Sequence, residues 1–157
     1  MKKEFILKTE HQTSKIGEKI GKLISSKFSI FLYGDLGSGK TTFTKGLAQG
    51  LGISDKYYIT SPTYNIINEY PGTHLFLYHI DLYRIQEVFE LDELGMDEIM
   101  SRQDAIVAIE WPELLEDIPS YSNDLKINLS INQNNSRKIS IFASGRKGAN
   151  LLKKLLL

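Results

Sequence analysis

Residues 34–42, Gly-Asp-Leu-Gly-Ser-Gly-Lys-Thr-Thr, carry the strongest chemical signal in the chain. They match the phosphate-binding-loop pattern G-x-x-x-x-G-K-[ST] at Gly34, Gly39, Lys40 and Thr41. The glycines permit positive φ and a close approach of the backbone, so that successive N–H groups can surround an anion. Lys40 supplies a charge for the β- and γ-phosphates, and the Thr41 hydroxyl is suited to the Mg²⁺ that bridges them. The loop therefore predicts a nucleotide site.

Two apolar segments later in the chain each end in an acid. Leu75 to Ile80 leads into Asp81, and Ala105 to Ile109 leads into Glu110. This pattern is typical of a buried strand that delivers a carboxylate to the edge of a parallel sheet. In phosphoryl transfer one carboxylate normally holds the metal and another polar group orients the attacking water. Asp81 and Glu110 are both candidates for these two roles.

The segment Ser61-Pro62-Thr63-Tyr64 lies on a predicted loop one element beyond the phosphate loop. A threonine there can act as a switch that senses the γ-phosphate and Mg²⁺. The alternative is a simple turn that leads into a strand, and spacing alone favours neither reading. Trp111, the only tryptophan, directly follows Glu110, so it is expected at the carboxyl edge of the sheet, where open α/β folds bind ligands.

The elements that must position these residues follow the order strand, glycine loop, helix. Residues 28–33 are a β-prone apolar run, and residues 42–51 lack proline and carry apolar residues at helical spacing. Before them, residues 4–8 are a strand candidate. Thr9 and Gln12 form a capping pair that predicts a helix over the following residues.

The rest of the chain predicts an α/β fold. It is a single P-loop domain over residues 1–157, with a central mostly parallel sheet, flanking helices and an antiparallel C-terminal extension. The expected elements are a hairpin (65–69 with 75–80), an acidic helix broken at Gly95 (85–100), two alternating strands (126–131 and 137–143) and a leucine-striped helical tail (149–157). The acidic helix is read as a solvated face rather than a partner surface, and the tail as packing on the domain rather than on a partner.

Composition sets further limits. The 19 basic and 19 acidic residues cancel, which removes the overall field that would draw a chain onto nucleic acid. There is no cysteine, so disulfides, thiol catalysis and thiolate metal sites are excluded. No apolar run approaches the length of a membrane span. We expect a soluble cytoplasmic protein.

Four blocks of sequence together resemble the TsaE (YjeE) family, the P-loop ATPases of bacterial tRNA threonylcarbamoyladenosine biosynthesis. The blocks are the phosphate loop at 34–42, Ser-Pro-Thr-Tyr at 61–64, His-Ile-Asp-Leu-Tyr-Arg at 79–84 and Glu-Trp-Pro at 110–112. Their order and spacing match as well. The resemblance covers essentially the whole chain and is most specific between residues 30 and 112.

The resemblance implies a small Mg-dependent ATPase, weak alone, that supports threonylcarbamoyl transfer to adenosine 37 of ANN-decoding tRNA. It implies two partners, the threonylcarbamoyl transferase subunit and its inactive paralogue, with tRNA engaged indirectly. ATP phosphates would lie on Gly37, Ser38, Gly39, Lys40, Thr41 and Thr42. By the same analogy Thr41 and Glu110 would serve Mg²⁺, Asp81 would be the catalytic or water-orienting acid, and Glu10, Thr63 and Trp111 would lie close to the nucleotide.

Two other readings of the phosphate loop stay open at the level of sequence. A small-molecule kinase would close an arginine-rich lid over two substrates, but the four arginines, at 84, 102, 137 and 146, form no cluster. A GTP-driven binding module would need a guanine-reading Asn-Lys-x-Asp segment, which the chain lacks. Nucleotide preference and the fate of the transferred phosphate distinguish these classes.

Overall fold

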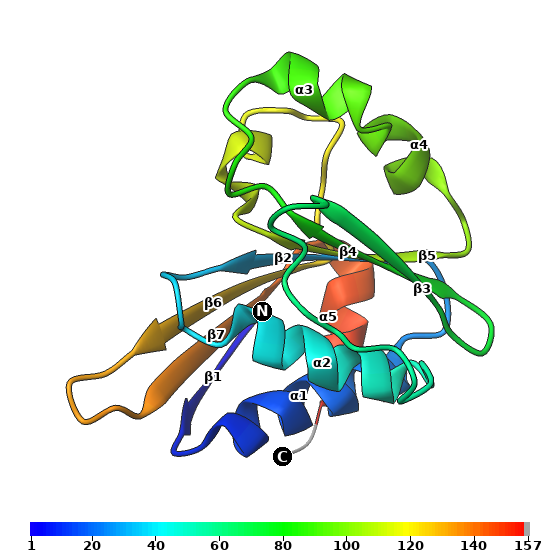
Figure 1. Ribbon diagram of the computed structural model, residues 1–157. Coiled ribbons are helices and arrows are strands. Elements are labelled where there is room, and N and C mark those ends of the chain that lie inside the picture. Colours follow the sequence, from blue (N-terminus) through cyan, green and yellow to red (C-terminus); the bar gives the residue numbers. More distant parts are fainter. Residues whose placement is uncertain (156–157) are drawn as a thin grey trace.

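The computed structural model describes residues 1–155 and contains a seven-stranded mixed sheet with helices on both faces (Figure 1). The strand order is β1-β7-β6-β2-β5-β4-β3. The central pairs β6–β2, β2–β5 and β5–β4 are parallel, whereas the pairs toward the two edges are antiparallel. The predicted α/β class, with a parallel centre and an antiparallel C-terminal extension, is confirmed.

The strands follow the apolar runs of the sequence. Their bounds are β1 (Lys2–Leu7), β2 (Phe28–Tyr33), β3 (Ile67–Pro71), β4 (Phe76–Asp81), β5 (Ala105–Glu110), β6 (Leu125–Ile131) and β7 (Arg137–Ala143). β2, β5 and β7 coincide with their predicted ranges. β3 is displaced toward the C-terminus from the predicted 65–69, because residues 63–65 form a turn before the strand begins. The first strand joins the sheet beside β7, at its outer edge.

Two helices, α1 (Glu10–Leu23) and α2 (Lys40–Gly50), cover the face of the sheet that carries the phosphate loop (Figure 1). Thr9 caps α1 as predicted, and its Oγ1 accepts a hydrogen bond from Gln12 N at 3.3 Å. The α1–α2 contact depends on glycine. A Cβ on Gly17 would lie 2.2 Å from the Phe43 carbonyl oxygen, so the two backbones approach more closely than side chains would allow.

The same face also holds α5 (Gly145–Lys154), whose buried residues Leu151 and Leu152 join α1 and α2 in one apolar core. The leucine tail therefore packs on the domain as predicted, although the last two residues of its predicted range, Leu156 and Leu157, lie outside the described residues. No helix within residues 1–155 combines the length and apolar character that crossing a membrane requires.

A second apolar core lies on the opposite face, under α3 (Val88–Glu93), α4 (Met96–Ser101) and the short 3₁₀ helix η1 (Pro112–Leu115). The helical segment predicted over 85–100 with a break at Gly95 is found here, although its first helix begins at Val88 rather than at Ile85. Gly95 adopts φ 69° as the N-cap of α4, so the segment consists of two short helices joined at that residue.

Candidate functional site

The phosphate loop joins β2 to α2 through a turn that only glycine can make. Gly34 has φ 141°, and a Cβ there would lie 2.3 Å from the Leu129 carbonyl oxygen. Gly39 has φ 111° and is the N-cap of α2, where its carbonyl oxygen accepts from Phe43 N at 2.9 Å. The loop therefore leads straight into the N-terminus of α2, where free N–H groups and the helix dipole favour an anion.

Lys40, the first residue of α2, has its side chain folded back over the loop. Its Nζ donates to the carbonyl oxygens of Gly34 at 2.5 Å and Asp35 at 3.0 Å, and lies 4.3 Å from the centre of the Trp111 ring. Burial lowers the pKa of Lys40, and the nearby carboxylates of Glu110 and Asp81 oppose this shift. The ammonium group is thus held by backbone oxygens and an aromatic face.

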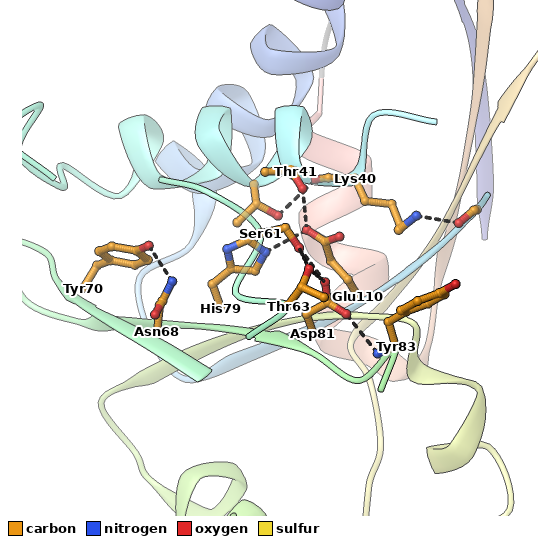
Figure 2. A network of polar contacts seen from close by, with 12 residues as sticks. Lys40, Thr41, Ser61, Thr63, Asn68, Tyr70, His79, Asp81, Tyr83 and Glu110 are labelled. Atoms are coloured by element: carbon orange, nitrogen blue, oxygen red, sulfur yellow. Dashed lines mark hydrogen bonds and ion pairs between the residues drawn. The ribbon is translucent and has the colours of Figure 1, made fainter. Parts of the chain in front are cut away.

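Asp81 and Glu110 end the adjacent parallel strands β4 and β5 and are partners in register. Each is only 3% exposed. The Thr41 hydroxyl donates to Glu110 Oε1 at 2.9 Å, and His79 Nε2 lies 2.8 Å from the same oxygen (Figure 2). The sheet thus presents two buried carboxylates side by side, and one of them already contacts the start of α2.

The segment 61–64 contacts the other carboxylate (Figure 2). Ser61 Oγ and Thr63 Oγ1 donate to Asp81 Oδ2 at 2.5 and 3.2 Å, and Tyr83 N donates to Oδ1 at 2.9 Å. A loop that departs from the sheet is therefore attached to an acid at the centre of the site. Both hydroxyls would change partners if Asp81 turned to another ligand.

These groups line one pocket of about 290 Å³. The predicted residues that line it are Glu10, Gly37, Gly39, Lys40, Thr41, Thr42, Thr63, Asp81, Glu110 and Trp111. Three further residues line the pocket: Leu36 and Tyr83, which had no predicted individual role, and Ser61, which belongs to the segment predicted as a switch. Ser38 is the one predicted residue outside the lining. Its side chain is buried, and its Oγ has no hydrogen-bond partner among the described residues.

Arg137, at the start of β7, also belongs to this region, although its sequence context predicted no role for it. Its Nη2 lies 3.2 Å from Glu10 Oε1, and its Nε, 3.6 Å from where a Gly39 Cβ would stand, is buried with no hydrogen-bond partner in the described chain. The predicted strand pair 126–131 and 137–143 could have placed Arg137 at this edge of the sheet. Because β7 runs antiparallel to β6, which is parallel to β2, the first residue of β7 must lie at the carboxyl edge.

The donor set suits a hard cation shared with a nucleotide. Thr41 and Glu110 offer a hydroxyl and a carboxylate oxygen 2.9 Å apart at the pocket wall. Within residues 1–155 no group of three or more His, Cys, Asp or Glu side chains is arranged to hold a metal. Mg²⁺ needs no such cage, since one or two protein oxygens, phosphate oxygens and water complete its shell.

Comparison with known proteins agrees with this site. The family model described as threonylcarbamoyl adenosine biosynthesis protein TsaE matches residues 7–139. The chain belongs to the TsaE family. The match takes in the phosphate loop, both carboxylates and Arg137, and it ends within β7, before α5 begins.

Two relatives in the TsaE family bear the name tRNA threonylcarbamoyladenosine biosynthesis protein TsaE. The Aquifex aeolicus protein is 36% identical over 140 residues, which is 89% of this chain and 96% of the relative. The Borreliella burgdorferi protein is 54% identical over 83 residues, which is 53% of this chain but only 58% of that relative. The crystal structure of Bacillus subtilis YdiB is similar throughout. It has a TM-score of 0.81 at 30% identity and covers 98% of this chain and 93% of that one.

Proposed function

We propose that this TsaE-family protein is a Mg-dependent ATPase of the cytoplasm that hydrolyses ATP to support threonylcarbamoyl transfer to adenosine in tRNA, as one P-loop domain over residues 1–157. The observation that carries the proposal is the convergence of Lys40, Thr41, Asp81 and Glu110 on one pocket. A phosphate loop alone indicates nucleotide binding. Two carboxylates beside its lysine and threonine add the means to hold a cation and align a water.

Each side chain has a role in this proposal. The loop and the start of α2 bind the phosphates, and Lys40 exchanges its bonds to Gly34 and Asp35 for bonds to phosphate oxygens. Thr41 and Glu110 hold Mg²⁺, which when bound supplies positive charge to the β- and γ-phosphates. Asp81 orients the attacking water, because its carboxylate lies at the pocket wall next to Glu110 in register.

Ser61 and Thr63 give the site a means of signalling. Both donate to Asp81 Oδ2, so an Asp81 that turns to a water must loosen its hold on the 61–64 segment. The nucleotide state is thereby coupled to a surface loop on which Tyr64 is 87% exposed. We propose that partners read this loop, and that they are the threonylcarbamoyl transferase subunit and its inactive paralogue, with tRNA engaged only through them.

Nucleotide titration tests the proposal. Trp111 fluorescence and calorimetry are followed with Mg·ATP, Mg·ADP and Mg·GTP on wild type, on Lys40→Ala and on Lys45→Ala, a control lysine on the exposed face of α2. We expect saturable binding of the adenine nucleotides that Lys40→Ala loses and Lys45→Ala keeps. Absence of nucleotide binding by wild type in both measurements would refute the proposed function.

Hydrolysis is tested separately from binding. Asp81→Asn keeps the size of the side chain but removes the negative charge that orients a water. We expect this variant to bind Mg·ATP and to lose most phosphate release, both alone and in a reconstituted tRNA modification reaction with the two partners. Transfer of phosphate to a small acceptor instead of water would indicate a kinase and contradict the ATPase assignment.

A further inference from the structure

His79 is a fully buried histidine in β4, a strand whose neighbouring buried residues are mostly apolar. Along β4 its neighbour on the same face, Leu77, belongs to the core under α1 and α2, while Tyr78 and Ile80 pack on the opposite face. The His79 side chain is 0% exposed, and its Nε2 lies 2.8 Å from Glu110 Oε1. The imidazole therefore lies two residues before Asp81 on the same face of β4, and it contacts Glu110 on the neighbouring strand β5.

The contact fixes which nitrogen carries the proton. Glu110 Oε1 also accepts from Thr41, so it is an acceptor, and His79 Nε2 must be the donor. The other nitrogen, Nδ1, is buried without a hydrogen-bond partner among the described residues. An unpaired buried polar atom is unfavourable, and a leucine at this position would avoid that cost. Fold stability alone therefore does not account for the histidine.

The two donors hold the same oxygen of Glu110 from different directions. Thr41 approaches from the start of α2, and His79 approaches from the sheet (Figure 2). Within the described chain both hydrogen bonds of this carboxylate end on Oε1, which leaves Oε2 available to the pocket. The bond from His79 comes from a residue that does not itself contact the cation, so it holds the carboxylate whichever way the Thr41 hydroxyl turns.

We propose that His79 is a positioning residue for the cation-binding carboxylate: Nε2–H holds Glu110 in the orientation that presents its free oxygen to Mg²⁺ at the nucleotide phosphates. The inference rests on the proposed function, because it assigns His79 to the same site. It adds a second hydrogen bond, from β4, to Glu110, the proposed Mg²⁺ ligand that otherwise accepts only from Thr41 among the described residues. Outer partners of metal ligands typically change metal affinity or activity by about 10- to 100-fold when removed.

Two variants that differ by one methylene test the contact. In His79→Gln the side-chain amide extends to about the position of the imidazole Nε2, whereas the amide of His79→Asn is too short to reach Glu110. The dissociation constant of ATP is measured by calorimetry with excess Mg²⁺ and again with EDTA. We expect His79→Asn to lose about 10- to 100-fold of the Mg-dependent affinity and to match wild type in EDTA. His79→Gln should stay close to wild type in both conditions.

The controls separate the possible failures. Ile80→Val, at the next position on the opposite face, reports a general loosening of β4 and should leave the Mg effect intact. A wild-type protein that binds no nucleotide would refute the proposed function itself. A wild-type Mg effect that survives unchanged in His79→Asn, or that is lost equally in His79→Gln, would overturn the role of His79.

A measurement on the wild-type protein does not depend on whether the variants fold. In a spectrum of ¹⁵N-histidine-labelled protein, the Nε2–H of His79 should give a slowly exchanging signal, because the ring is fully buried and bonded to a carboxylate. We expect this signal to persist when Mg²⁺ and ADP are added. Its disappearance on addition would show that the bond is broken in the loaded site and would contradict the proposal.

Discussion

Replacing Gly46 by alanine tests the close α1–α2 contact beneath the phosphate loop. A Cβ on Gly46 would lie 1.8 Å from the Ser14 carbonyl oxygen, and real Cβ atoms stay at least 3.0 Å from such an atom. The two backbones must therefore separate by at least about 1.2 Å, the difference between these distances. The obstructing atom is main chain, so no side-chain rotation relieves the overlap. Overpacking costs about 1–3 kcal/mol, and a clash with main chain that cannot rotate away lies in the upper part of this range, about 2–3 kcal/mol.

Helix propensity acts in the opposite direction, since alanine is favoured over glycine within a helix by about 1 kcal/mol. We therefore expect a net loss of about 1–2 kcal/mol in the free energy of unfolding. For a chain of this size that corresponds to a fall in Tm of about 2–8 °C. Urea denaturation followed by circular dichroism measures the effect, with Gln49→Ala on the exposed face of α2 as the control for propensity. A Gly46→Ala protein as stable as wild type would show that the close contact is not required.

Three further changes are expected to act through single contacts. Thr9→Ala removes the acceptor for Gln12 N and should cost about 1 kcal/mol of unfolding free energy in urea denaturation. Leu152→Ala empties a fully buried site under α5 and should cost about 2–5 kcal/mol in the same assay. Hydrogen bonds from two lysines lower the pKa of Glu18 from 4.5 to about 2, so its stabilising contribution is present above about pH 4.5 and is lost as the pH falls toward 2. Glu18→Gln should therefore flatten the fall in stability across that interval, measured as Tm against pH; an unchanged slope would contradict this assignment.

The parts of the fold that sequence predicts well are those set by short-range pattern. Strands 28–33, 105–110 and 137–143 coincide with the observed ones, because each is an apolar or alternating run with clear polar boundaries. The pocket residues were also predictable, since a glycine loop before a helix and acids at strand ends must meet at one edge of a parallel sheet. Their roles in binding and catalysis remain predictions.

The remainder depends on contacts between distant segments. Gly17 and Gly46 read in sequence only as weak points in their helices, yet the structure places each against the backbone of the other helix. His79 contacts Glu110 only because β4 and β5 are neighbours in a particular register. The boundary error at β3 has a local cause, because residues 63–65 form a turn before the strand begins.

The placement of β1 at the edge of the sheet determines when it can pair during folding. Its register partner is β7, with Lys2 opposite Phe142, so the first strand described along the chain pairs with the last one. Such long-range pairing slows folding, because the chain loses the entropy of closing a large loop before the strand contacts stabilise it. Until β7 emerges, β1 has no neighbour in the sheet, and Glu10 at the start of α1 has no Arg137 to meet. A nascent chain can thus make its phosphate loop early, but the Glu10–Arg137 contact beside the pocket must wait until β7 has been made.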